Sequence, residues 1–344
     1  YTKYYMLEAR SFSVPRFALP FALIFNRSFL CVSFCISFLS FLGSWRVYKM
    51  FYELYPHMHK KLAYAILFMP SVLFWGVSLL KDSFSIAALG FFVYAAYSIL
   101  IKRRNIISSL IALYVSGYVL LSLKPYILVA MSAVFLLWYF MLFREKIEDK
   151  TLRTISTLGF VGIAVAAGFL ISQSLTSSES ASQFSSDQLL NSVQAQQAIF
   201  SGNPELGSGS NFEVDKAESP LKIAALFPLG VVNTYFRPFP WDVRSPVMIL
   251  SFFEAFAFIA LTFKCFRRIG VGKAFSLIFS DPVILFCFIF AILFGALIGI
   301  TTTNFGALVR YKIPSLSFYA VAILLTMEKS GKFPEPYIFS RRLF

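Results

Sequence analysis

The sequence predicts an all-α, polytopic transmembrane helix bundle, and three observations support this fold class. Of the 344 residues, 58% are hydrophobic and only 14% are charged, whereas a soluble domain is usually about a quarter charged. Apolar stretches near the length that crosses a bilayer, roughly 20 residues, recur along the chain. Most of the Lys and Arg residues fall in the short segments between those stretches, as in multi-pass membrane proteins.

The apolar stretches predict about nine membrane spans. Pro70 interrupts the second, and Lys81–Asp82–Ser83 forms a predicted turn before the third. The fourth ends at Leu123–Lys124–Pro125, because proline lacks a helix donor and disfavours helix in the residue before it. The predicted spans are 28–44, 62–80, 84–101, 106–122, 126–143, 156–174, 245–263, 282–300 and 314–327.

Three regions follow from this pattern. Residues 1–174 form an N-terminal transmembrane bundle, and because the chain starts at Tyr1 we expect a further span to precede it. Residues 175–244 form a large loop, whose Ser- and Gln-rich first part we expect to be the least ordered. Its second part, 220–244, is apolar but carries four prolines, which favours an interfacial or re-entrant element. Residues 245–344 hold the C-terminal spans and a basic tail.

The distribution of the 31 Lys and Arg residues predicts the orientation. The larger share lies in 45–61, 102–105, 144–154, 264–281 and the tail, so these segments are predicted to be cytoplasmic. The loops 175–244 and 301–313 are then external. The net charge of +14 is therefore a topology signal, and nucleic acid is not an expected partner.

Several chemistries have no support in the sequence. It contains no nucleotide-binding loop, zinc-ligand spacing or nucleophile elbow. His57 and His59 have no nearby ligands to complete a metal site. None of the four cysteines lies in the large loop, so a structural disulfide is not expected. These absences argue against an ATP-driven pump and against hydrolases of those types.

The candidate site residues gather at the predicted external loop ends. Short external loops normally avoid cations, yet Arg310 and Lys312 lie in one, at 301–314. Lys81, Lys124 and Arg237 occupy similar positions. Lys and Arg at such depth can bind phosphate, Arg as a planar fork and Lys as a point charge. The sequence therefore predicts an external site for an anionic substrate.

A carboxylate among these cations could serve as a general base toward a sugar hydroxyl. Asp82 and Glu8 are the candidates. Asp82 could instead be the N-cap of the third span.

The other candidates also have structural alternatives. Lys81 and Lys124 could extend to lipid headgroups, and Arg237 could form a local ion pair with Asp242. Glu254, inside the seventh span, must be protonated or paired, and functional and packing roles are both open.

Four motifs resemble a known group of proteins: PSVLFWGVSLLKDS (70–83), SLKPY (122–126), FRPFPWD (236–242) and NFGALVRYKIP (304–314). Together with the many spans and the large late loop, they resemble bacterial GT-C-type glycosyltransferases and O-antigen polymerase-like proteins. The resemblance implies transfer of a sugar from a polyprenyl phosphate or diphosphate at the external face of the inner (cytoplasmic) membrane. It implies a polyprenyl-linked sugar or glycan, membrane lipid and envelope-biosynthesis proteins as partners. It requires no cofactor, although some relatives use a divalent metal.

Carried over by residue, Arg310 and Lys312 match the cations that bind the donor phosphate, with Arg237, Lys124 and Lys81 as further candidates. The first external loop, which holds the base in GT-C enzymes, is only partly present, so the base stays open between Glu8 and Asp82.

Two other functions are alternatives to sugar transfer. A transporter or flippase for an anionic lipid or glycan predicts charges through the middle of the bilayer, and a non-catalytic envelope-complex subunit predicts that the site residues are replaceable.

Overall fold

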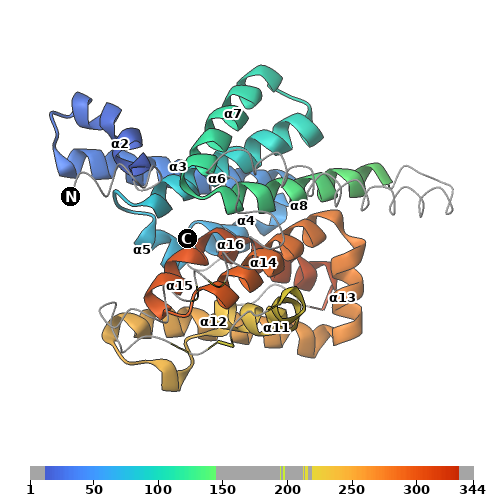
Figure 1. The fold of residues 1–344 in the computed structure, drawn as a ribbon. Coiled ribbons are helices and arrows are strands. Elements are labelled where there is room, and N and C mark those ends of the chain that lie inside the picture. Colours follow the sequence, from blue (N-terminus) through green and yellow to red (C-terminus); the bar gives the residue numbers. More distant parts are fainter. Residues whose placement is uncertain are drawn as a thin grey trace, which may run out of the picture. The chain divides into compact units, whose positions relative to one another are not determined.

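The computed structural model describes residues 12–144, 194, 197, 212, 214–215 and 219–332, and this part of the chain is built from helices without strands (Figure 1). The predicted all-α class is confirmed. The helices are α2 (Ser13–Ile24), α3 (Phe29–Leu54), α4 (His59–Ile66), α5 (Pro70–Trp75), α6 (Lys81–Tyr97), α7 (Ile106–Leu123), α8 (Pro125–Arg144), α11 (Pro220–Phe236), α12 (Pro246–Ile269), α13 (Val271–Ser280), α14 (Pro282–Thr301), α15 (Phe305–Tyr311) and α16 (Ile313–Lys329). Short 3₁₀ turns lie at Pro56–Met58 and Pro240–Asp242, and a π-helical turn at Ser98–Lys102 extends α6.

Six helices of the described part are long and apolar enough to cross a membrane: α3, α6 with its π-helical turn, α7, α8, α12 and α14. Helices α15 and α16 would form a seventh span together, with a bend of 63° between them. These helices indicate a multi-pass membrane protein. Helix α11 is shorter, as expected for an element that is not a simple span.

The prediction of nine spans is wrong for the part of the chain that is described, which holds six or seven. The predicted span 62–80 is two short helices, α4 and α5, because Pro70 begins α5 and holds Met69 in an extended conformation (φ −68°, ψ 121°). The predicted turn at 81–83 is also wrong, since α6 begins at Lys81. The predicted span 156–174 and most of the Ser-rich loop lie outside the described residues.

Proline sets the start of five helices. Pro70, Pro125, Pro220, Pro246 and Pro282 are the first residues of α5, α8, α11, α12 and α14. A proline at this position loses nothing, because the first N–H groups of a helix have no intrahelical partner. The proline-containing breaks in the sequence therefore become helix starts.

The chain divides into two compact units. Unit 1 comprises Tyr1–Leu128, Phe256–Ala291 and Ile313–Phe344. In it, α3 and α6 pack closely, and a Cβ added at Gly90 of α6 would collide with the backbone of Gly43 in α3. The ring of Phe318 in α16 lies among Phe51, Phe286 and Phe290, with centroid distances of 4.9–6.1 Å.

Unit 2 comprises Val129–Ala255 and Ile292–Lys312. In it, α11 packs against the second half of α14, where Gly230 and Gly299 allow backbone-to-backbone contact. The Thr234 hydroxyl donates to the Gly295 carbonyl at 2.6 Å, and the Asn233 amide donates to the Gly299 carbonyl at 3.2 Å. These buried contacts fix the C-terminal half of α11 on α14.

The ion pairs of unit 1 join helix ends that the sequence assigns to the same side of the membrane. On the predicted cytoplasmic side, Lys102 pairs with Glu53 at 2.9 Å and Lys329 pairs with Asp281 at 2.6 Å. Lys61 pairs with Glu328 there as well, at 2.9 Å. Each of these three pairs therefore joins segments that the sequence assigns to one side of the membrane. The orientation, and the division of the chain at residues 174 and 244, stay predictions.

Candidate functional site

A buried ion pair lies at the junction of α6, α7 and α8 in unit 1. Lys124 occupies the single non-helical position between α7 and α8, with φ −145° and ψ 72°. Its Nζ donates to Oδ1 of Asp82, in the first turn of α6, at 2.5 Å. The Lys124 and Asp82 side chains are 6% and 2% exposed. Proximity and burial together make this a charge-assisted hydrogen bond shielded from water.

This pair changes the interpretation of its residues. The N-cap of α6 is Leu80, so the prediction that Asp82 caps the helix is wrong. Lys124 is buried against a carboxylate, so the prediction that it extends to headgroups is also wrong. Lys81 is half-buried at the first position of α6, beside the pair in sequence. The structure thus brings together a candidate base and a candidate phosphate-binding cation.

A second buried pair lies in unit 2, between Glu254 of α12 and Lys312. Lys312 occupies the break between α15 and α16, and its Nζ lies 3.7 Å from Oε1 of Glu254. The two side chains are 0% and 2% exposed, for lysine and glutamate respectively. Isolated ions are costly at such depth, so each charge stabilises the other. The expectation that Glu254 is protonated or paired is met by pairing, and Lys312 faces this carboxylate.

Arg237 forms a third pair, with Asp242, and this one is partly open. The Arg237 Nε lies 3.5 Å from Oδ2 of Asp242, and the arginine side chain is 22% exposed. The same carboxylate oxygen accepts a hydrogen bond from the Phe239 N–H at 2.9 Å. The predicted local ion pair is therefore confirmed, and it holds the proline-rich turn after α11 closed.

An aromatic residue that the sequence did not single out supports Arg237. The guanidinium carbon lies 4.9 Å from the centroid of the Phe212 ring, within range of a cation–π contact. The Phe212 N–H donates to the Thr303 carbonyl at 2.9 Å, and its ring lies 4.8 Å from that of Phe305. Phe212 thus links Arg237 to the segment between α14 and α15. No motif marks Phe212, because the link depends on a segment distant in sequence.

Arg310 lies in the last turn of α15 and is half-buried. Asn304 is the N-cap of α15, and its side-chain oxygen accepts a hydrogen bond from the Ala307 N–H at 3.1 Å. Arg310, Lys312 and Arg237 are therefore all positioned around α15 or the segment that leads into it. Glu8, the other candidate base, lies outside the described residues.

Buried polar atoms accompany this part of unit 2. Oδ1 of Asn233 and the hydroxyls of Thr302 and Thr303 are buried and have no hydrogen-bond partner among the described residues. Such atoms are rare in protein interiors and usually bind water or a ligand. Thr and Asn residues are too common in sequence for this group to be recognised without the fold.

No protein-family model, curated protein or solved structure matches the chain.

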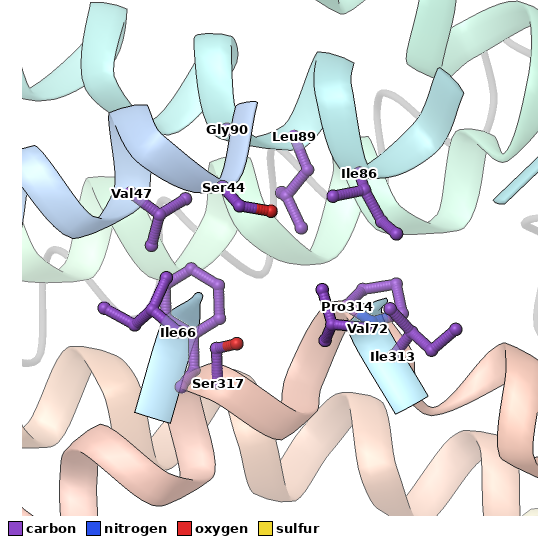
Figure 2. Close-up of a pocket in the computed structure, with 11 residues that line it drawn as sticks. Ser44, Val47, Ile66, Val72, Ile86, Leu89, Gly90, Ile313, Pro314 and Ser317 are labelled. Carbon is purple, nitrogen blue, oxygen red and sulfur yellow. The ribbon is translucent and has the colours of Figure 1, made fainter. Parts of the chain in front are cut away.

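The described residues contain no group of three His, Cys, Asp or Glu side chains that could hold a metal ion. A cavity in unit 1, between α3, α4, α5, α6 and α16, measures about 30 Å³ (Figure 2). Its only polar side chains are Ser44 and Ser317. Its volume is comparable to that of one or two water molecules, so it is a packing void and not a sugar-binding site.

Proposed function

We propose that this chain is a membrane glycosyltransferase or polysaccharide polymerase that uses a polyprenyl-(di)phosphate-linked sugar at the external face of the bacterial inner membrane. The observation that carries the proposal is the buried Asp82–Lys124 pair. It places a carboxylate and a cation in contact at helix ends that the sequence assigns to the external side. An acid–base group and a phosphate-binding group are the two functions that such a transfer needs.

In this proposal the substrate phosphate takes the place of Asp82 on Lys124. The released carboxylate then accepts the proton of the acceptor hydroxyl as that oxygen bonds to the anomeric carbon of the sugar. The bond between this carbon and the phosphate oxygen breaks, and the polyprenyl (di)phosphate leaves with its negative charge balanced by Lys124. Arg237 and Arg310 are further cations for a phosphate, and no metal is needed for this charge balance.

The test is complementation of cells of the native host that lack the protein. Asp82→Asn and Lys124→Met are expected to abolish surface glycan when the glycan is measured per amount of each variant in the membrane, whereas Arg104→Gln, on the predicted cytoplasmic side, should restore it. If the protein is a transferase, cells with an inactive variant accumulate the lipid-linked precursor on the external face, where a membrane-impermeant reagent can reach it. The paired variant Asp82→Leu/Lys124→Met separates structure from chemistry, because it removes both charges together. If this variant restores the glycan, the pair is structural only and the proposal fails.

The Glu254–Lys312 pair favours a second candidate, a flippase for an anionic lipid or glycan. Ionisable residues inside spanning helices are typical of transport pathways, and this pair is fully buried. A flippase defect leaves the precursor on the inner face, out of reach of the impermeant reagent. Glu254→Gln is therefore the informative variant: protected precursor would favour transport, and accessible precursor would favour transfer. If neither kind of precursor accumulates and every variant is active, the non-catalytic subunit remains.

A further inference from the structure

The end of α12 carries an exposed basic cluster that the proposed function does not use. Lys264, Arg267 and Arg268 line a surface hollow of about 460 Å³ together with Phe263. Lys273 follows on α13 and is exposed. The stretch 263–280 contains no acidic residue, and Asp281, which follows it, is engaged by Lys329 at 2.6 Å. The hollow is therefore positive without a carboxylate from its own stretch to neutralise it.

The cluster begins where the lipid-facing side of α12 ends. Phe256 and Phe263 are 57% and 62% exposed on this helix, as expected for side chains that contact lipid tails. Arg267 lies one turn beyond Phe263, and its guanidinium carbon is 5.9 Å from the phenyl centroid. One turn of helix rises about 5.4 Å. Arg267 can therefore lie at the level of the lipid headgroups while Phe263, one turn earlier, lies at the level of the lipid tails.

Helix α13 supplies an apolar face beside these cations. Ala274 and Ile278 are buried in unit 1, while Val271 and Phe279 remain 60% and 57% exposed. Phe275 is 38% exposed, and its ring lies 5.6 Å from that of Phe266 in α12. Only part of the apolar face of α13 therefore packs against the protein, and the rest of that face is exposed. A short helix with exposed aromatic residues and adjacent Lys and Arg is typical of an element in the membrane interface.

We infer that α13 and the end of α12 form a binding surface for anionic phospholipid headgroups. Arg267 and Lys264 bind the phosphodiester, Arg as a fork and Lys as a point charge. Val271, Phe275 and Phe279 enter the layer beneath the headgroups. These features favour a lipid over a soluble anion, because cations and exposed phenyl groups lie together and a soluble anion would need only the cations.

The test uses the full chain, purified and delipidated in detergent, and native mass spectrometry to count bound phosphatidylglycerol and phosphatidylcholine. The variant Lys264→Gln/Arg267→Gln is compared with Arg103→Gln/Arg104→Gln, which removes two exposed cations from another basic turn. The first is expected to weaken phosphatidylglycerol binding about tenfold, and the control to leave it within about twofold. Phosphatidylcholine binding should stay unchanged in both. Equal losses in the two variants would show that total charge decides binding, and the inference would be overturned.

A second comparison separates lipid from soluble anion. Phe275→Ser/Phe279→Ser keeps every cation, and it should weaken phosphatidylglycerol binding without changing the thermal stability of the protein. Inorganic phosphate at equal concentration should not displace the lipid. If phosphate displaces it, or if the phenylalanine variant binds lipid normally, the surface binds a soluble anion or nothing specific. Neither outcome depends on glycan synthesis, so this inference can fail while the proposed function stands.

Discussion

Replacing Lys124 with Met is expected to destabilise the protein by about 3–5 kcal/mol, the usual cost of leaving one buried ion without its partner. The pair is separated by 2.5 Å, and at that distance an effective dielectric constant near 20 gives an attraction of about 7 kcal/mol. Removing two ions from water costs several kcal/mol for each. The intact pair is thus close to balanced, and the large penalty appears only when Asp82 is left alone.

The paired variant removes both buried charges together. Asp82→Leu/Lys124→Met should lie within about 1 kcal/mol of the unchanged protein, because no buried charge remains. SDS-induced unfolding of the purified protein, with the two single variants completing a double-mutant cycle, measures the coupling energy. Each single variant leaves one buried ion without its partner, at about 3–5 kcal/mol, and the paired variant costs at most about 1 kcal/mol, so a coupling of about 5 kcal/mol or more is expected. A loss below about 1 kcal/mol for Lys124→Met, or a paired variant as unstable as the two singles added together, would refute the buried pair.

Three further predictions concern helix packing, capping and the proline-rich turn. Gly90→Val should prevent close packing of α3 and α6 and reduce folded protein at least tenfold in size-exclusion profiles, whereas Gly117→Ala, whose added Cβ would meet only a side-chain atom 4.0 Å away, should be tolerated. Asp281→Ala should cost about 2 kcal/mol in SDS unfolding, since it removes both the cap of α14 and an ion pair; Lys329→Ala removes only the pair and should cost about 0.5 kcal/mol. Trp241 is 73% exposed, and in an interfacial turn it would be quenched by lipids brominated near the headgroup. Trp241→Phe should therefore remove a large part of the quenched fluorescence. Unchanged quenching would place this turn in water.

The sequence predicts the helical class and most of the spans because long apolar runs are strong local signals. The span 62–80 fails for a reason that is also local: Pro70 begins a new helix, so the run is apolar throughout but not a single helix. The start of α6 is predicted too late, because the charges of Lys81 and Asp82 indicate a turn outside the apolar span. Both residues are in fact part of the first helical turn. Both errors arise from treating hydrophobicity and helix as the same property.

The site is predictable in its residues but not in their pairing. Asp82 and Lys124 can be selected as charges at span ends, and Glu254 as a charge inside a span. Their partners depend on which helices pack together, and apolar spans offer few distinguishing residues for that assignment. Arg237 and Asp242 are the exception, because they are close in sequence and a stiff turn brings them together. Phe212 is the opposite case, since its contact with Thr303 joins segments far apart in the chain.

The two buried ion pairs can form at different stages of protein synthesis, because their second partners are synthesised at different times. Asp82 and Lys124 flank the α6–α7 hairpin, so both charges are present as soon as that hairpin leaves the ribosome. Glu254 enters with α12, but Lys312 follows only after α14 has been made. An unpaired acidic residue at the centre of a span costs about 2.5–3.5 kcal/mol during insertion. A nascent chain that stops after α14 therefore carries an uncompensated carboxylate in α12, and Lys312 must be synthesised before that charge is balanced.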